Sequence, residues 1–91
     1  MKRPDEPNLA RRELYLELRE GSLSIGQATR RMRKIVGKSQ VEFAELLGIT
    51  LRILREIEKD QGNPTLKTLQ KIGILYGLKI GFVRKSKDPQ V

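Results

Sequence analysis

The 91-residue sequence contains no cysteine and no histidine. Without cysteine there is neither a disulfide framework nor a thiolate metal site, and without histidine the usual general base and the commonest metal ligand are both missing. There is also no Gly-rich phosphate loop and no pair of carboxylates placed to form a pocket. We therefore expect no enzyme activity, no catalytic residue, no metal and no cofactor.

Long apolar runs are missing as well, since no stretch approaches the roughly 18 apolar residues of a membrane span. The first residues show no signal-peptide pattern. We therefore expect a cytoplasmic protein with no membrane partner. Apolar residues make up only 37% of the chain, so we expect one small domain that gains from burial against a second subunit.

Acidic residues are scarce relative to basic ones, which leaves a formal net charge of +8. Residues 1–23 are net neutral, whereas residues 24–59 and residues 60–91 each carry a net +4. The positive charge therefore belongs to the body of the chain and not to a basic tail at its start. Such a charge favours a polyanion as partner, although a merely solvated basic surface has the same composition.

The stretch from Ser39 to Lys59 predicts two short helices joined by a tight turn. Ser39 is a good N-cap, and the run after it places Phe43, Ala44 and Leu47 on one face. Gly48 follows directly, and glycine is the commonest residue just past a helix end because it accepts a left-handed backbone.

The second of these helices is predicted from Leu51 to about Lys59, with Thr50 as its cap. At about 100° per residue, Leu54 and Ile57 share an apolar underside. The opposite face is charged and mostly basic, and it consists of Arg52, Arg55, Glu56 and Lys59. This helix is therefore expected to be buried on one side and to present a basic ridge on the other.

Two further helices are predicted before this stretch. Residues 9–21 alternate apolar and polar side chains as a strand would, yet Leu14 and Leu18 stand four residues apart and the composition favours a helix ended by Gly21. A capping box at Ser24 then opens a second helix, which Gly37 ends. Its apolar stripe consists of Ile25, Ala28, Met32, Ile35 and Val36.

After a loop rich in turn formers, Thr65 caps a fifth helix that Gly77 ends. Its residues spaced for burial are Leu66, Leu69, Ile72 and Leu75. Residues 79–84 change to a period of two and predict a strand. One strand without a neighbour is unstable, so the nearest partner is the same strand of a second copy. The residues on its apolar side, expected to make this dimer contact, are Leu78, Ile80 and Phe82. Residues 1–8 are expected to be a disordered tail and residues 85–91 a flexible one.

Residues 24–78 resemble the XRE/Cro helix-turn-helix regulators, the phage-repressor-like class. The residues that carry the resemblance are Gln40, Ala44, Leu47-Gly48-Ile49-Thr50, Ile57-Glu58 and Asn63-Pro64-Thr65-Leu66. The resemblance implies an all-α, mainly helical, five-helix domain that binds double-stranded DNA. It also implies a bacterial cytoplasmic protein that is associated with the nucleoid.

With the C-terminal segment Leu78-Lys79-Ile80-Gly81-Phe82 included, the pattern is most similar to the HipB antitoxins. Members of that family repress their own operon and accompany HipA-type kinase toxins. The resemblance implies a homodimer built by strand pairing across two copies, and a HipA-like kinase as a protein partner.

The basic helix is expected to enter the major groove of B-DNA, where each base pair presents a distinct pattern of donors and acceptors. Arg52 and Arg55 can each direct a fork of donors to guanine, and Glu56 can accept from cytosine or orient an arginine. The expected base-reading residues are Thr50, Leu51, Arg52, Arg55 and Glu56. The expected phosphate-binding residues are Lys38, Ser39, Gln40, Lys59 and Asn63.

One carboxylate is expected to be structural. Glu58 lies within about 40° of Leu54 on the inward side of its helix, and burying an unpaired charge costs several kcal/mol. The resemblance implies a structural ion pair between Glu58 and Arg33. Two residues depart from the family pattern: Leu51 replaces a polar base-reading residue, and Asp60 replaces a glycine, which would place negative charge near the phosphates.

Two kinds of function therefore remain open. The first is a sequence-specific repressor that binds a palindromic operator as a dimer, either as an antitoxin or as a stand-alone phage-type regulator. The second is an interaction module whose main role is to hold a toxin or another protein. It is suggested by apolar residues in excess of what the helical faces need: Tyr15, Leu16, Val41, Leu46 and Ile74.

Overall fold

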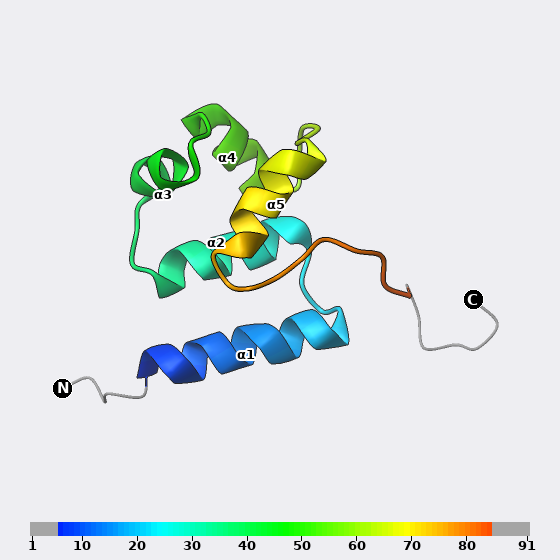
Figure 1. Ribbon diagram of the computed structural model, residues 1–91. Helices are drawn as coiled ribbons and strands as arrows, with labels where there is room; N and C mark the ends of the chain where they lie inside the picture. The colour runs from blue at the N-terminus through cyan, green and yellow to red at the C-terminus, as the bar shows by residue number, and fades with distance from the viewer. Residues whose placement is uncertain (1–5, 85–91) are drawn as a thin grey trace.

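The computed structural model describes the backbone of residues 6–84 and the side chains from residue 9 onward. Within that range the chain forms five helices and no strand, which confirms the mainly helical five-helix architecture. The helices are α1 (Glu6–Glu20), α2 (Ile25–Ile35), α3 (Gln40–Leu47), α4 (Leu51–Glu58) and α5 (Leu66–Ile74). Figure 1 shows α2 in the middle, with α1 on one side of it and the α3–α4 pair on the other.

The starts of four helices are determined by the residues next to them. In each case a side-chain hydroxyl accepts a hydrogen bond from the backbone N–H three residues later, which satisfies a donor that the helix itself leaves unpaired. The four caps are Ser24, Ser39, Thr50 and Thr65. In the first two, Gln27 and Glu42 complete a capping box by accepting from the backbone N–H of the serine.

The core lies between α2, the α3–α4 pair and α5, and α1 closes it from outside. Leu14, Phe43 and Leu54 are completely buried within it. Tyr76 is buried as well, and its hydroxyl donates a hydrogen bond to the main-chain oxygen of Met32 at 2.7 Å. Tyr15 in turn donates to the main-chain oxygen of Tyr76 at 2.9 Å, which connects α1 to the end of α5.

The helix α1 begins three residues earlier than the sequence predicted. Residues 6–8, assigned to a disordered tail, are helical, because proline at position 7 is tolerated in a first turn where its missing N–H would be unpaired anyway. The rest of that predicted tail, residues 1–5, and the predicted tail at 85–91 lie outside the described residues. The alternative that residues 9–21 form a strand is wrong, because α1 is helical as far as Glu20.

The predicted apolar stripes are buried at their centres and exposed at their ends. Ala28 and Met32 are buried in α2, whereas Ile25 and Val36 at its two ends are exposed. In α5 the same holds for its outer positions, which are exposed although their spacing predicted burial: Leu66 and Leu75. The neighbouring helices cross these helices near their middles, so an amphipathic pattern continues beyond the length that is covered.

Residues 78–84 form no strand in the single chain that is described. The chain turns at Gly77, which has a φ of 66°, and Leu78 N–H then donates to the main-chain oxygen of Gly73 at 2.9 Å. A Cβ atom on Gly73 would lie 2.9 Å from the oxygen of Leu78, so only glycine allows this crossing. Leu78 packs against the core, Ile80 is exposed and Phe82 is fully exposed. A strand requires a paired neighbour, and the described chain offers none to residues 79–84.

None of the helices in the described range is long and apolar enough to cross a membrane.

Candidate nucleic-acid interface

The turn between α3 and α4 follows from two adjacent backbone requirements. Gly48 adopts a left-handed conformation with a φ of 70°, and its N–H donates to main-chain oxygens in the last turn of α3. Thr50 is extended, and its side chain accepts from the N–H of Ile53, which starts α4. The two helices are therefore joined by a short turn, which is the arrangement of a helix-turn-helix.

The helix α4 is attached to the core by one face and exposed on the other. Leu54 and Ile57 are buried against the rest of the core. On the opposite side, the side chain of Arg52 is 88% exposed. Arg55 and Lys59 are exposed too, as is the cap residue Thr50. A rigid helix with buried anchors thus carries three cations directed toward solvent.

The expected base-reading residues lie together along this face. All of them except Thr50 line a shallow hollow of about 200 Å³, together with one residue that the sequence did not single out, Gln61. The other residues that line it are Leu51, Arg52, Arg55, Glu56 and Lys59. Gln61 lies in the turn-rich loop after α4. Its N–H donates to the main-chain oxygen of Glu56 at 2.8 Å, which holds it beside α4. The sequence held no local signal for this return of the chain.

Glu56 has a structural reason to lie beside Arg52. Its carboxylate is 4.0 Å from Nε of Arg52, one helical turn earlier. On its other side it lies against Gly62, where an added Cβ would approach the glutamate side chain to 3.2 Å. Gly62 also has a φ of 74° and thus a conformation that favours glycine. Of the two roles expected for Glu56, this geometry matches the orientation of an arginine.

The expected phosphate-binding residues come from three places along the chain: the start of α3, the end of α4, where Lys59 lies, and the α4–α5 loop. Lys38, Ser39 and Gln40 lie just before and at the start of α3, where the positive end of the helix favours an anion although the capping box already pairs the N–H groups of Ser39 and Glu42. Asn63 is exposed in the α4–α5 loop and lines a second small hollow, of about 120 Å³, which shares Glu56 and Gln61 with the first. The expected phosphate-binding residues therefore lie before, at the end of and after α4 along the chain.

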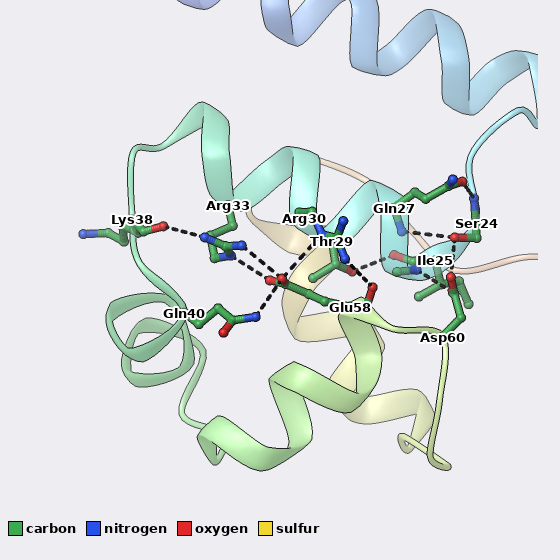
Figure 2. A network of polar contacts seen from close by, with 11 residues as sticks. Ser24, Ile25, Gln27, Thr29, Arg30, Arg33, Lys38, Gln40, Glu58 and Asp60 are labelled. Carbon is green, nitrogen blue, oxygen red and sulfur yellow. Dashed lines mark hydrogen bonds and ion pairs between the residues drawn. The ribbon is translucent and has the colours of Figure 1, made fainter.

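Glu58 stands behind this surface at the centre of a polar cluster (Figure 2). Its side chain is 2% exposed, and its two carboxylate oxygens accept from Nε and Nη2 of Arg33 at 2.7 and 3.1 Å. Gln40 Nε2 donates to Oε1 at 3.1 Å, and Arg30 approaches the same oxygen at 3.9 Å. Burial raises the pKa of Glu58, but the hydrogen bonds from Arg33 and Gln40 outweigh it and hold the pKa below its usual value. Arg33 also donates to the main-chain oxygen of Lys38 at 3.1 Å.

Asp60 has a role that differs from the one its sequence position suggested. Its carboxylate accepts from the hydroxyl of Ser24 at 2.7 Å and from the N–H of Gly26 at 2.8 Å, as Figure 2 shows for Ser24. These two hydrogen bonds lower the pKa of Asp60. The negative charge is therefore directed to the positive end of α2. No side chain fits at Gly26, because its Cβ would lie 2.6 Å from the main-chain oxygen of Ile57.

These features match a known protein family. The sequence profile described as "Helix-turn-helix" matches residues 30–83, more than half of the chain. The chain belongs to the helix-turn-helix family. The matched range of this helix-turn-helix chain begins within α2, includes α3, α4 and α5, and ends in the C-terminal segment, so that α1 lies before it.

Two curated helix-turn-helix relatives are similar over most of this chain. One is the HTH-type transcriptional regulator PuuR of Escherichia coli, which is 36% identical over 73 residues, covering 76% of this chain and 40% of the relative. The other is the immunity repressor protein of Bacillus phage phi105, which is 30% identical over 61 residues, covering 67% and 42%. The chain thus matches about two fifths of the length of each relative. No solved structure matches significantly.

Proposed function

We propose that this helix-turn-helix protein is a transcriptional repressor that binds a palindromic DNA operator as a homodimer. The observation that carries the proposal is the orientation of α4, whose buried face holds Leu54 and Ile57 and whose free face presents Arg52. The names of the two relatives, a transcriptional regulator and an immunity repressor, support the same conclusion. Such a regulator acts on the bacterial chromosome and therefore in the cytoplasm.

In this proposal α4 is the recognition helix in the major groove. Arg52 and Arg55 donate to guanine edges, Glu56 orients Arg52, and Leu51 with Thr50 contacts thymine methyl groups or the backbone. The start of α3 and the loop at Asn63 bind phosphates on either side. Two copies then bind half-sites about one helical turn apart. No residue is assigned a catalytic role, and no cofactor is required.

The test starts from the operator, which selection from a library of random duplexes identifies. Arg52→Ala is expected to lose about 1–3 kcal/mol of discrimination at one base pair, because one bidentate contact is removed. Fluorescence anisotropy with the selected operator and with a scrambled duplex measures the ratio of the two affinities. This ratio falls if Arg52 reads a base.

Arg19→Ala is the matched control. Arg19 is exposed in the last turn of α1, a helix that lies on the other side of α2 from α4 (Figure 1), and its removal changes the net charge by the same amount. We expect it to weaken binding to both duplexes slightly and equally. If Arg52→Ala bound the two duplexes in the wild-type ratio, the assignment of Arg52 to base readout would be wrong.

A second candidate role is that of an antitoxin holding a HipA-like kinase. The observation that favours it is the exposure of large apolar side chains on helices outside α4: Tyr15, Leu16, Val41, Leu46 and Ile74. A contiguous exposed apolar patch marks a surface that binds another protein, and the second candidate role requires that residues of this set form such a patch. This role is compatible with repression, since an antitoxin can repress the operon that encodes both partners.

Affinity purification of the tagged chain from its native host distinguishes the two roles. An antitoxin is expected to retain a kinase in stoichiometric amount, and Leu46→Ser or Ile74→Ser is expected to weaken that complex while leaving DNA binding intact. Purification of the DNA-binding dimer alone, with no kinase at any stage, would leave the chain as a stand-alone repressor.

A further inference from the structure

A further hollow of the described chain lies away from the exposed face of α4. It is an open groove of about 260 Å³ between the end of α1, the helices α2 and α5, and the start of the C-terminal segment. Most of its wall is apolar, and the side chains that matter here are Leu23, Met32, Leu69, Leu78 and Ile80. The groove is smaller than the roughly 300–1,000 Å³ of a typical small-molecule pocket, and its size suits one or two side chains.

Directly beyond this groove the chain carries apolar residues that nothing covers within the described structure. Ile80 lines the groove and is partly exposed, whereas Phe82 and Val83 are among the most exposed residues of the chain. A phenylalanine side chain can bury about 150–250 Å². In the described part of the chain, the groove lacks an apolar side chain to fill it, and Phe82, two residues after the groove residue Ile80, lacks an apolar surface to cover it.

The alternation of side chains along an extended segment decides whether the groove can take Phe82 of its own chain or Phe82 of a second copy. Side chains at positions 78, 80 and 82 lie on one side of such a segment. Leu78 and Ile80 line the groove, so this side faces it, but Phe82 of the same chain lies beyond its edge. In an antiparallel pair, residues directly opposite each other point to the same face.

A two-fold pair that keeps its apolar residues on one face must pair even-numbered positions with even-numbered positions. The Phe82 side chain of the second copy then lies opposite Ile80 if the axis passes through Gly81, and opposite Leu78 if it passes through Ile80. Both residues line the groove. Both of these registers place the Phe82 ring of one copy over the groove of the other, whereas an axis through Phe82 itself would pair the two rings with each other and leave the groove open.

We propose that Phe82 of a second copy fills the groove between α1, α2 and α5. The inference rests on the homodimer of the proposed function and adds the residue and the surface that make it. The contact between Phe82 and the groove would also stabilise the strand pair, because an isolated two-stranded sheet is marginal in water and needs packing against a helix. The groove provides that packing against α2 and α5, with Leu18 of α1 and Leu23 of the α1–α2 connection completing its wall.

The sequence allows a direct test, because it contains no tryptophan. Phe82→Trp places a single reporter at the proposed contact, and Val83→Trp places one on the opposite side of the segment. Sedimentation is followed over a concentration series together with tryptophan emission. We expect the emission of Phe82→Trp to shift to the blue as dimer forms, and that of Val83→Trp to stay typical of water.

Phe82→Ala is expected to weaken the dimer at least about tenfold, as truncation of an interface hot spot does, whereas Val83→Ala changes it little. In a mixture of unlabelled protein and protein labelled at its methionine methyl groups, an isotope-filtered experiment is expected to show a contact between Met32 and the Phe82 ring of the other copy.

Each alternative outcome contradicts either the groove contact alone or the homodimer as well. If the wild type dimerises while Phe82→Trp stays in water, or while Phe82→Ala dimerises normally, the groove is not filled by Phe82 and the homodimer itself stands. If the wild type sediments as a monomer at every concentration, both the groove contact and the dimeric repressor are wrong. Titration with the selected operator then shows separately whether the single chain binds DNA.

Discussion

The side-chain amide of Gln40 donates a hydrogen bond to the buried carboxylate of Glu58, with 3.1 Å between Nε2 and Oε1. Gln40 opens α3 and belongs to the proposed phosphate-binding surface, whereas Glu58 ends α4 behind that surface. Arg33 completes the arrangement by neutralising Glu58 with two hydrogen bonds. The cluster thus connects the stability of the core with the orientation of a side chain that we expect to contact DNA.

Removal of Glu58 is expected to destabilise the fold strongly. Glu58→Ala leaves the guanidinium of Arg33 without its partner in a mostly buried position, which costs about 3–5 kcal/mol. A thermal melt followed by circular dichroism measures the loss. Glu45→Ala, at an exposed position of α3, serves as the control and should change the midpoint little. An unchanged midpoint in Glu58→Ala would rule out a stabilising ion pair.

Lys38 and Gln40 are expected to affect DNA binding in different ways. Each phosphate neutralised by a cation contributes about −0.9 to the slope of log K against log salt. Lys38→Ala should therefore make the slope shallower by about 0.9. Gln40→Ala should weaken binding by roughly 0.5–1.5 kcal/mol with an unchanged slope, because a neutral amide releases no counterion. Anisotropy titrations at several salt concentrations measure both quantities, and equal slopes for Lys38→Ala and the wild type would exclude a phosphate contact by Lys38.

Asp60 is expected to make stability depend on pH in the acid range. Its hydrogen bonds from Ser24 and Gly26 lower its pKa in the folded state below the usual value of 3.8. The stabilisation is therefore fully present above that value and is lost as the pH falls through the lower, folded-state pKa. Urea unfolding at a series of pH values below about 5 should show a steeper loss in the wild type than in Asp60→Asn.

Asp60→Asn is a conservative comparison, because asparagine tolerates the positive φ of 56° at this position and keeps one acceptor oxygen. The pKa of Glu58 is lowered as well, but Glu58 is present in both proteins. The difference between the stability–pH curves of the wild type and Asp60→Asn therefore reports on Asp60 alone. Parallel curves would show that the contact to the start of α2 contributes nothing measurable.

Two leucines on α1, only two residues apart, are expected to differ sharply in how much stability the fold loses when each is replaced by alanine. Leu14 is 0% exposed and Leu16 is 55% exposed. Leu14→Ala should destabilise the fold by about 2–5 kcal/mol, and Leu16→Ala should fall within about 0.5 kcal/mol of the wild type. Chemical denaturation measures both values. Equal losses would mean that both leucines lie on one buried face, as in a strand, and would contradict the helical α1.

The helix starts could be predicted from the sequence because each depends on residues that lie close together. Ser39 and Thr50 accept from N–H groups three residues away, and Gly48 acts on the turn that contains it. The orientation of Arg52 followed from helical periodicity for the same reason. Local chemistry therefore determined the helix-turn-helix and the side of α4 that faces solvent.

Contacts between distant residues could not be predicted in this way. Asp60 bonds to residues 34 and 36 positions earlier, and the return of Gln61 beside Glu56 depends on how the loop packs. The pattern of residues 79–84 indicated a strand, but periodicity cannot supply the neighbour that a strand needs. The exposed ends of the apolar stripes, such as Ile25 and Leu66, depended on where other helices cross.

The close crossing at Gly73 has a consequence for how the protein is placed on DNA. Because the oxygen of Leu78 lies only 2.9 Å from where a Cβ of residue 73 would be, the start of the segment 79–84 packs directly on the backbone of α5. In the proposed dimer the symmetry axis follows from the direction in which this segment leaves the body, and so does the rotation of one α4 relative to the other around the double helix. A single methyl group at position 73, far from any base, would therefore alter which operator spacings both copies can bind in phase.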